Sequence, residues 1–284
     1  MTKNFLLGLG AMKCGTTWVH DYLAEHPQAS MGFIKEFHVF DTLYLDADVS
    51  PLKGELNTLA EIADTGQLKG GRQRATLTRL AMASNPNLYG AYFQSLAAAE
   101  QVRVVGDITP SYSGLSVDNL LAIKRLLKRY GFRLKPLYIM RDPVGRLKSH
   151  AAHVSRGSEP LRPVDEMRRM EDLIERNSVQ AKSSYIRTLT TLFDAFKMER
   201  LVLVFEDLFR EESLRQLTDY LEIDYVPADF TSRANASSSN YELTEAEREH
   251  FAQYFVDDIR AAMIYFGKDY IRKHWPSAQF VQFT

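Results

Sequence analysis

Cysteine is almost absent from this sequence, because its 284 residues include only Cys14. A single cysteine cannot form an intrachain disulfide and gives no indication of a zinc cluster. Long apolar runs are missing as well, and the short run that reaches Gly10 is followed at once by Lys13. The sequence therefore predicts neither a signal peptide nor a membrane span, and we expect a cytoplasmic protein.

An excess of charge of one sign is also lacking, since the formal net charge is -1. This balance gives no global electrostatic reason to expect a nucleic acid or an anionic membrane as partner, although a local basic cleft is compatible with it. The composition, 45% hydrophobic and 25% charged, is that of a soluble globular protein. No interdomain linker is visible, so residues 1–284 are expected to form a single domain. The sequence does not indicate an oligomeric state.

What the sequence does contain is a glycine-punctuated turn near its start. Residues 5–9 have the apolar character of a buried strand, and apolar residues recur at helical spacing in residues 16–26. In a strand, loop and helix of this kind, the unpaired amides of the first helical turn converge where the helix dipole is positive. The turn between Gly10 and Gly15 therefore predicts a site for an oxyanion such as phosphate or sulfate.

The nearest general pattern is the Walker A loop, in which a lysine follows the second glycine and the next hydroxyl binds Mg²⁺. Here Gly10 and Gly15 have the required spacing, but Thr16 replaces that lysine. Lys13 brings the cation from within the turn instead, and Thr17 adds a second hydroxyl. These differences argue against an ordinary NTPase and for a loop that holds a terminal 5′ anionic group without an obligatory metal.

Strand and helix patterns alternate along the rest of the chain. Buried strands are expected at residues 102–106, 134–140 and 201–205, and an amphipathic helix is expected at 115–130. Such alternation favours a parallel sheet with right-handed crossovers. We expect an α/β domain with a central, mainly parallel sheet of four or five strands and helices on both faces. A long helix is expected to begin after Thr244 and to continue past residue 259.

Residues 42–101 contain no convincing strand. Short helices are expected around residues 77–82 and 89–100, and a basic run extends from Lys69 to Arg74. Such a run is usually a solvated, glycine-rich surface loop. The functional alternative is a lid or an insert on the acceptor side of an active site.

Three motifs in this order resemble those of a known family. The sequence GAMKCGTTW at residues 10–18 is similar to the 5′-phosphosulfate loop of sulfotransferases that use 3′-phosphoadenosine 5′-phosphosulfate (PAPS). The sequence KEFHVFD at residues 35–41 resembles the motif that carries a glutamate base in the carbohydrate branch. Arg141-Asp-Pro, with Ser149 eight residues after the arginine, is similar to the family's 3′-phosphate site.

The resemblance implies a P-loop-like sulfotransferase fold and a transferase activity. A sulfuryl group would move from PAPS to a hydroxyl, or to an amine, of an unidentified small-molecule or saccharide acceptor. The product would be adenosine 3′,5′-bisphosphate, and no metal would be required. The cofactor-binding residues that the resemblance implies are Lys13, Cys14, Gly15, Thr16, Thr17, Trp18, Arg141, Ser149 and Arg233.

The catalytic roles are also implied by the resemblance. Lys13 would neutralise the charge that develops on the leaving phosphate. Glu36 would be the general base, and His38 would orient Glu36 or contact the acceptor. Without the resemblance, a surface carboxylate paired with Lys35 would be the favoured interpretation of Glu36. A structural histidine is as good an interpretation of His38 as a direct role. Asp41 is expected to be a helix or turn cap.

Three further positions, Ile108, Asp107 and Cys14, bear on the site. Ile108 lies where the carbohydrate branch commonly has a second lysine, so the sequence departs from the two-lysine pattern. Asp107 either contacts the acceptor or simply ends the strand before it. Cys14 could act as a nucleophile at a helix start, but loop filler is the simpler interpretation.

Two alternatives to a sulfotransferase remain at the level of the sequence. One is a P-loop-type kinase for a small molecule, which would require Mg²⁺ and ATP. The other is a nucleotide-binding module that has retained the cofactor site without catalysis.

Overall fold

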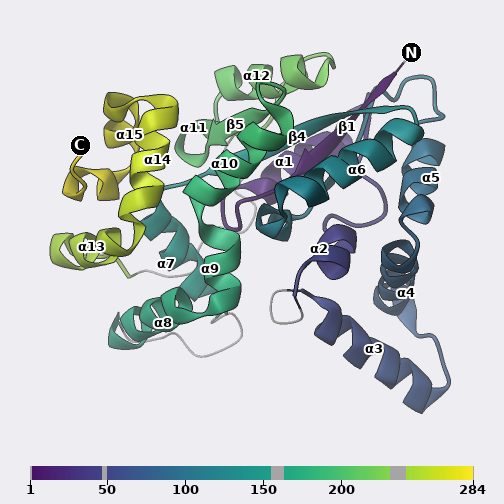
Figure 1. Cartoon of the computed structure of the whole chain (residues 1–284), viewed down its shortest axis with the longest axis horizontal. Coiled ribbons are helices and arrows are strands. Elements are labelled where there is room, and N and C mark those ends of the chain that lie inside the picture. Colours follow the sequence, from purple (N-terminus) through teal and green to yellow (C-terminus); the bar gives the residue numbers. More distant parts are fainter. Residues whose placement is uncertain (1, 47–49, 155–162, 231–240, 284) are drawn as a thin grey trace.

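A five-stranded parallel sheet forms the centre of the protein (Figure 1). The computed structural model describes residues 2–46, 50–154, 163–230 and 241–283. In the sheet the strand order is β2-β3-β1-β4-β5, and every pair is parallel. This arrangement confirms the predicted α/β class. The strands are β1 Lys3–Gly8, β2 Ala29–Ser30, β3 Val104–Ile108, β4 Phe132–Met140 and β5 Leu201–Val204.

The central strand β1 is apolar because helices cover the sheet on both faces. Phe5, Leu6 and Leu7 are completely buried, as expected for a strand without a solvent face. The two-residue strand β2 was not predicted, because it lies in what the sequence indicated as a turn after the first helix. It pairs with β3 through Ala29↔Val104 and Ser30↔Val105.

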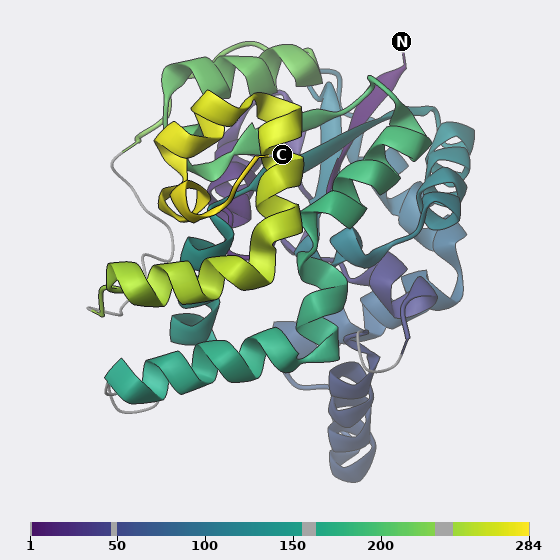
Figure 2. The ribbon, with the colours of Figure 1, turned by 60° about the vertical axis from the view of Figure 1, so that its left-hand side comes forward.

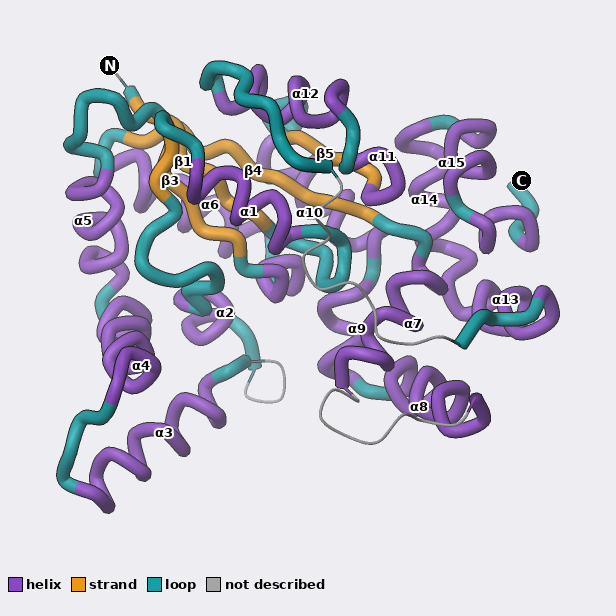
Figure 3. Tube along the Cα trace, turned by 180° about the vertical axis from the view of Figure 1, so that it is seen from behind, coloured by secondary structure: helices purple, strands orange, loops and turns teal. Residues whose placement is uncertain are grey.

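Helices α6 and α10 pack over the face of the sheet that is nearer in Figure 1, and α1 lies on the opposite face (Figure 3). The α-helices are α1 Thr16–Glu25, α2 Val39–Tyr44, α3 Leu52–Thr65, α4 Gly70–Ser84, α5 Pro86–Leu96, α6 Val117–Arg129, α7 Pro143–Val154, α8 Pro163–Glu175, α9 Asn177–Ser183, α10 Tyr185–Phe196, α11 Phe205–Leu208, α12 Glu211–Leu221, α13 Glu245–Ala252, α14 Val256–Phe266 and α15 Lys268–His274.

The region between residues 42 and 101 is more helical than predicted. The basic run at residues 69–74 is the start of α4 and not a glycine-rich loop, although its side chains are largely exposed as expected. Helix α3, which the sequence did not indicate, extends away from the sheet (Figures 1 and 2). Its one buried side chain among the described residues is Glu55, which forms an ion pair with Arg79 of α4 at 3.1 Å.

The long helix expected after Thr244 is interrupted. Thr244 caps α13 as predicted, since its hydroxyl accepts from Glu247 N at 3.3 Å and the Glu247 carboxylate accepts from Thr244 N at 2.8 Å. The α-helix then ends at Ala252. A 3₁₀ turn at Gln253–Phe255 separates it from α14. None of the helices in the described ranges combines the length and the apolar character that a bilayer crossing requires.

Candidate active site

The loop between β1 and α1 is built from left-handed backbone positions. Gly15 has φ 81° and immediately precedes α1, and a Cβ there would lie 2.5 Å from Leu208 Cδ2. Lys13 also has a positive φ, 64°. Ala11 N donates to Ile139 O and Ile139 N donates to Gly10 O, both at 2.8 Å. The loop is thus fixed to the sheet, and the free amides of the first turn of α1 lie at the carboxyl edge.

A cavity of about 570 Å³ lies at this edge. Segments that follow four of the parallel strands line it: Lys13 after β1, Ser111 after β3, Arg141 after β4 and Phe205 after β5. Ligands bind outside the carboxyl ends of the strands in open α/β sheets. The predicted site residues that share this cavity are Lys13, Gly15, Thr16, Thr17, Trp18, Glu36, His38, Arg141 and Ser149.

Arg141 connects the far side of the cavity to the loop. Its Nη1 donates to Lys13 O at 3.1 Å, and its guanidinium lies over the Phe205 ring at 4.3 Å. Ser149 lies in α7, whose first turn begins at Pro143. Asp142 caps this helix, because its Oδ1 accepts from Val144 N at 2.9 Å.

One of the predicted cofactor residues in the described ranges, Cys14, does not contribute its side chain to the cavity. The Cys14 side chain is fully buried, so only its backbone can face a ligand. Burial raises the pKa of this thiol to about 11, although Arg146 and Arg141 oppose the shift, and this value disfavours a thiolate nucleophile. Arg233 lies outside the described residues.

The cavity is rich in nitrogen-bearing side chains. Lys35, Lys182 and His153 line it together with Lys13 and Arg141. This set of donors suits a ligand with more than one anionic group, because each cation can neutralise a different oxyanion. Within the described ranges, no group of three or more His, Cys, Asp or Glu side chains could hold a metal ion.

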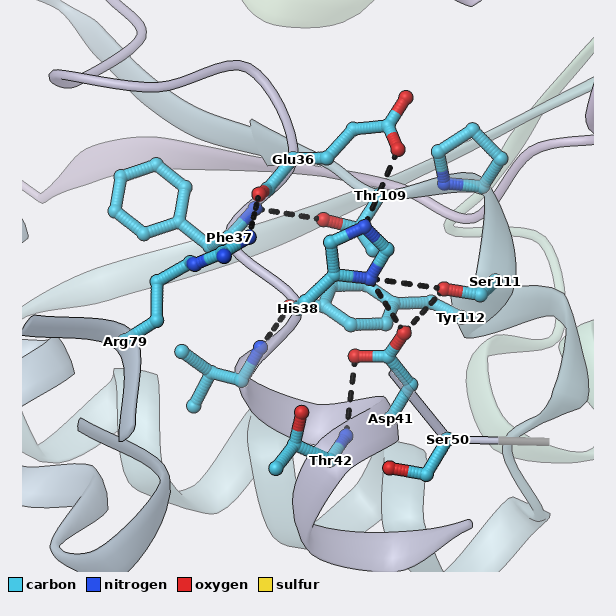
Figure 4. Close-up of polar contacts among 12 residues, drawn as sticks. Glu36, Phe37, His38, Asp41, Thr42, Ser50, Arg79, Thr109, Ser111 and Tyr112 are labelled. Atoms are coloured by element: carbon cyan, nitrogen blue, oxygen red, sulfur yellow. Dashed lines mark hydrogen bonds and ion pairs between the residues drawn. The ribbon is translucent and has the colours of Figure 1, made fainter. Parts of the chain in front are cut away.

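Glu36, His38 and Asp41 form a linear array of charges (Figure 4). His38 Nε2 lies 3.3 Å from Glu36 Oε2, and His38 Nδ1 lies 2.7 Å from Asp41 Oδ2. Asp41 is completely buried and also accepts a hydrogen bond from the Ser111 hydroxyl. Glu36 additionally pairs with the Lys35 ammonium group.

These contacts determine the protonation of the array. Burial by itself would lower the pKa of His38, but the hydrogen bonds with Asp41 and Glu36 raise it to about 9. Burial would likewise raise the pKa of Glu36, yet the hydrogen bond from His38 and the charge of Lys35 hold it at about 2. At neutral pH the imidazolium therefore lies between two carboxylates, and Glu36 is ionised and able to accept a proton.

The array is held in place by the end of β3. Asp107 is completely buried and accepts hydrogen bonds from Thr109 Oγ1 at 2.6 Å, Tyr112 OH at 2.7 Å and Tyr89 OH at 3.0 Å. Thr109 Oγ1 in turn accepts from Phe37 N at 3.1 Å, between Glu36 and His38. Asp107 is thus occupied by protein donors, and of the two roles open for it the structural one agrees with its contacts.

The segment at residues 35–41 differs from its predicted form. Its alternating apolar residues indicated an extended segment with one inward face. Instead His38 adopts a left-handed conformation with φ 53° and directly precedes α2. Asp41 lies inside α2, so the expected role as a cap is wrong. The sequence signal that could have revealed Asp41 is its spacing of three residues from His38, which places both side chains on one helical turn.

Ile108 offers no cation to the cavity. Its side chain is completely buried at the end of β3 and packs on Gly8, where a Cβ would lie 2.8 Å from Ile108 Cγ2. The position at which a second lysine is common is therefore part of the core. Lys35 and Lys182 bring charge to the cavity from other segments.

The fold and the cavity define an α/β protein with an anion-binding loop at the carboxyl edge of a parallel sheet. The model of the sulfotransferase family matches residues 6–227, and the chain belongs to this family. It is an enzyme, a sulfotransferase. No curated protein matches the chain in sequence.

Solved structures of sulfotransferases are similar to this chain at low sequence identity. The crystal structure of a sulfotransferase from Alicyclobacillus acidocaldarius has 18% identity and a TM-score of 0.59, and the match covers 98% of this chain and 100% of that one. A sulfotransferase domain from the curacin biosynthetic pathway has 18% identity and a TM-score of 0.47, with 84% of this chain and 80% of that chain covered. A sulfotransferase domain from the Synechococcus PCC 7002 olefin synthase has 17% identity and a TM-score of 0.43, with 79% and 74% covered.

Proposed function

We propose that the enzyme transfers the sulfuryl group of PAPS to a hydroxyl group, with Glu36 as the general base. The observation that carries this proposal is a single cavity lined by the anion loop, by Arg141 with Ser149, and by Glu36. The two ends of one nucleotide and an acceptor hydroxyl need these three groups within reach of one another. An amine acceptor would use the same groups.

The donor set fits the nucleotide. The loop amides and Lys13 would hold the 5′-phosphosulfate, and Arg141 with Ser149 would hold the 3′-phosphate, where a guanidinium can donate two hydrogen bonds. The distance of 3.1 Å between Arg141 Nη1 and Lys13 O supports this, because both groups can contact one ribose-bearing ligand. PAPS supplies the activated sulfuryl group when bound.

In the transfer, the acceptor oxygen forms a bond to sulfur while the bond from sulfur to the phosphate oxygen breaks. Glu36 accepts the proton of the acceptor hydroxyl. Lys13 and the amides at the start of α1 stabilise the negative charge that develops on the phosphate. His38 is a positioning residue, since its imidazolium donates to Glu36 and to Asp41 and fixes the carboxylate of Glu36 in the cavity.

The helices between residues 42 and 101 would border the acceptor hydroxyl at Glu36. Arg79 of α4 reaches the catalytic segment, because its Nη1 donates to Glu36 O at 3.5 Å. This contact supports the interpretation of these residues as an acceptor-side insert and not as a detached surface loop.

Replacement of the base tests the proposal. Glu36→Gln should lower transfer of label from ³⁵S-PAPS by roughly two to four orders of magnitude, because an amide cannot take the proton. Its affinity for adenosine 3′,5′-bisphosphate, measured by calorimetry, should stay close to that of the wild type. The matched control is Glu61→Gln on α3, which makes the same exchange on an exposed helix face.

Three outcomes would contradict the proposal. Full transfer by Glu36→Gln would remove Glu36 as base. Binding of the wild type to ATP·Mg²⁺ far above its binding to the bisphosphate would favour the kinase alternative. Tight binding of the bisphosphate without transfer to any acceptor would favour a non-catalytic module.

A further inference from the structure

A second cavity adjoins the first. It has a volume of about 380 Å³ and lies among α7, α9, the start of α10 and the turn that leads into α14. Met12, Lys13 and His150 line both cavities, so these three residues form the wall between them. None of the three motifs that define the family resemblance accounts for this space, apart from that shared wall.

Branched side chains form part of the lining of the second cavity. Five of them, from α7, α8, α9, α10 and α14, are Leu147, Ile174, Val179, Ile186 and Val256. Polar side chains, among them Gln180, Ser183 and Gln253, line it as well. The branched side chains offer an apolar ligand a surface from which water is released on binding.

The buried polar groups of this wall are mostly engaged within the protein. Arg146 Nη1 donates to Ser183 Oγ at 3.0 Å and Nη2 donates to Ser183 O at 3.2 Å. Asp258 Oδ1 accepts from Tyr185 N at 2.7 Å. Arg146 Nε has no partner within the described residues. This nitrogen is therefore one of several donors of the lining, together with Gln180 and Gln253, beside the aliphatic side chains.

Two of the residues between the cavities, Met12 and His150, allow an apolar group to pass from one cavity to the other. Met12 is an unbranched side chain that can change rotamer at little cost. Burial and the charges of Arg146 and Lys13 lower the pKa of His150 to about 4, so its imidazole is neutral at physiological pH. An apolar group that crosses beside Met12 and His150 does not have to displace a charged imidazolium.

We propose that the second cavity binds the apolar body of the acceptor while the acceptor hydroxyl lies at Glu36. The acceptor would then be an amphipathic alcohol with an aliphatic or alicyclic body. This assignment rests on the proposed sulfuryl transfer. The first cavity contains the anion loop and Arg141, which suit the nucleotide, and the second cavity shares a wall with it and adds five branched aliphatic side chains.

A series of n-alkyl primary alcohols from butanol to decanol tests the assignment. Transfer from ³⁵S-PAPS is measured for each alcohol, and binding of hexanol and octanol to the enzyme saturated with adenosine 3′,5′-bisphosphate is measured by calorimetry. We expect kcat/KM and affinity to rise about fourfold for each added methylene until the cavity is filled. Glucose should be a poor acceptor.

Two variants fill the cavity from opposite walls. Val179→Phe on α9 and Val256→Phe on α14 should each reduce kcat/KM for octanol about tenfold or more, while butanol is little affected. Affinity for the bisphosphate should not change, which also reports that the variants are folded. Val164→Phe is the matched control, because Val164 is exposed on α8 and does not line the cavity.

The outcomes separate this inference from the proposed function. Transfer that does not depend on chain length, or a dependence unchanged in both filling variants, would overturn the cavity assignment and leave the sulfotransferase proposal intact. Binding that rises with chain length and is abolished by both variants, but without transfer to any alcohol, would support the cavity and overturn hydroxyl transfer at Glu36.

Discussion

At the scale of single residues, His38 has the most unusual environment in the candidate site. Its two ring nitrogens face two carboxylates, at 3.3 Å to Glu36 and 2.7 Å to Asp41. An imidazole can donate from both nitrogens only when it is protonated. The His38 imidazolium therefore carries one positive charge between two carboxylates. Glu36 stays ionised, and its charge is only partly neutralised.

This arrangement predicts the pH dependence of the enzyme. The pKa of His38 is raised to about 9, so its two contacts are present below that pH and are lost as the pH rises through it. The pKa of Glu36 is lowered to about 2, so Glu36 remains ionised at every pH well above this value. We expect kcat/KM to be flat at neutral pH and to fall above about pH 9.

The profile is measured with the wild type and with His38→Gln, which retains a donor but cannot titrate. The alkaline decline should disappear in this variant. A decline of kcat/KM below about pH 6.5 that is present in the wild type and absent from His38→Gln would contradict the prediction. It would mean that His38 titrates at the ordinary pKa of histidine.

Arg141 gives a second prediction at this scale. Arg141→Ala should weaken binding of adenosine 3′,5′-bisphosphate by about 2 kcal/mol or more, as expected for the loss of a charged hydrogen-bond partner. Adenosine 5′-phosphate, which lacks the 3′-phosphate, should be much less affected. Calorimetry with both nucleotides provides the measurement, and Arg215→Ala on the exposed face of α12 is the control. Equal losses for both nucleotides would remove the assigned role.

At the scale of elements, the position of Glu36 depends on the end of β3. Asp107 gathers hydroxyl donors from Tyr89, Thr109 and Tyr112. Tyr112 OH in addition accepts from Val39 N at 3.2 Å, at the first residue of α2. These bonds connect α5, β3 and the catalytic segment, so a change at Asp107 should be transmitted to Glu36.

Asp107→Asn tests this connection. Four donors, the Phe37 amide and the hydroxyls of Tyr89, Thr109 and Tyr112, surround the carboxylate oxygens. The amide nitrogen of asparagine would therefore face another donor and remain unsatisfied. We expect a loss of stability of about 1–3 kcal/mol, measured by denaturant unfolding. The turnover should fall as well, whereas nucleotide affinity should be largely retained. Thr65→Val, at an exposed hydroxyl on α3, is a control for the loss of a local hydrogen bond. Unchanged stability in Asp107→Asn would exclude the anchoring role.

Some elements could be predicted from the sequence and others could not. The strands β1, β3, β4 and β5 were predicted because a strand that is buried on both faces is a continuous apolar run. The break between α13 and α14 was not predicted, since the apolar spacing of four residues continues through it. The break places Tyr254, Phe255 and Val256 at the second cavity, so it depends on packing with α9 and α10 and not on local propensity.

At the scale of the whole molecule, the C-terminal segment anchors the Arg141 turn. Asp142 Oδ2 accepts from Ser277 N at 2.8 Å. Glu206 accepts from Asp142 N at 3.1 Å and from the Trp275 indole at 3.0 Å. Burial raises the pKa of Glu206 to about 7, although the hydrogen bond from Asp142 N opposes the shift. Residues beyond the part matched by the family model therefore support the Arg141 side of the cavity.

Trp275→Phe should destabilise the protein mainly at alkaline pH. Phenylalanine fills most of the space but cannot donate to Glu206. Because the pKa of Glu206 is raised, the ionised carboxylate that needs this donor predominates only above about pH 7. We expect a loss of about 1–3 kcal/mol near pH 8.5 and a smaller loss near pH 5.5, measured by denaturant unfolding. In a Glu206→Gln background this pH dependence should disappear, and its persistence there would assign the effect to another group.

The sequence by itself determined the parallel α/β class, the anion loop and the three motifs of the family, because strand burial, glycine conformation and local spacing are properties of short segments. Only the tertiary structure decided that Ser111 donates to Asp41 beside His38, that Ile108 is part of the core, and that a second cavity adjoins the one that contains Glu36. These features join residues that are far apart in the chain, and chain folding brings them together through packing that no single segment encodes.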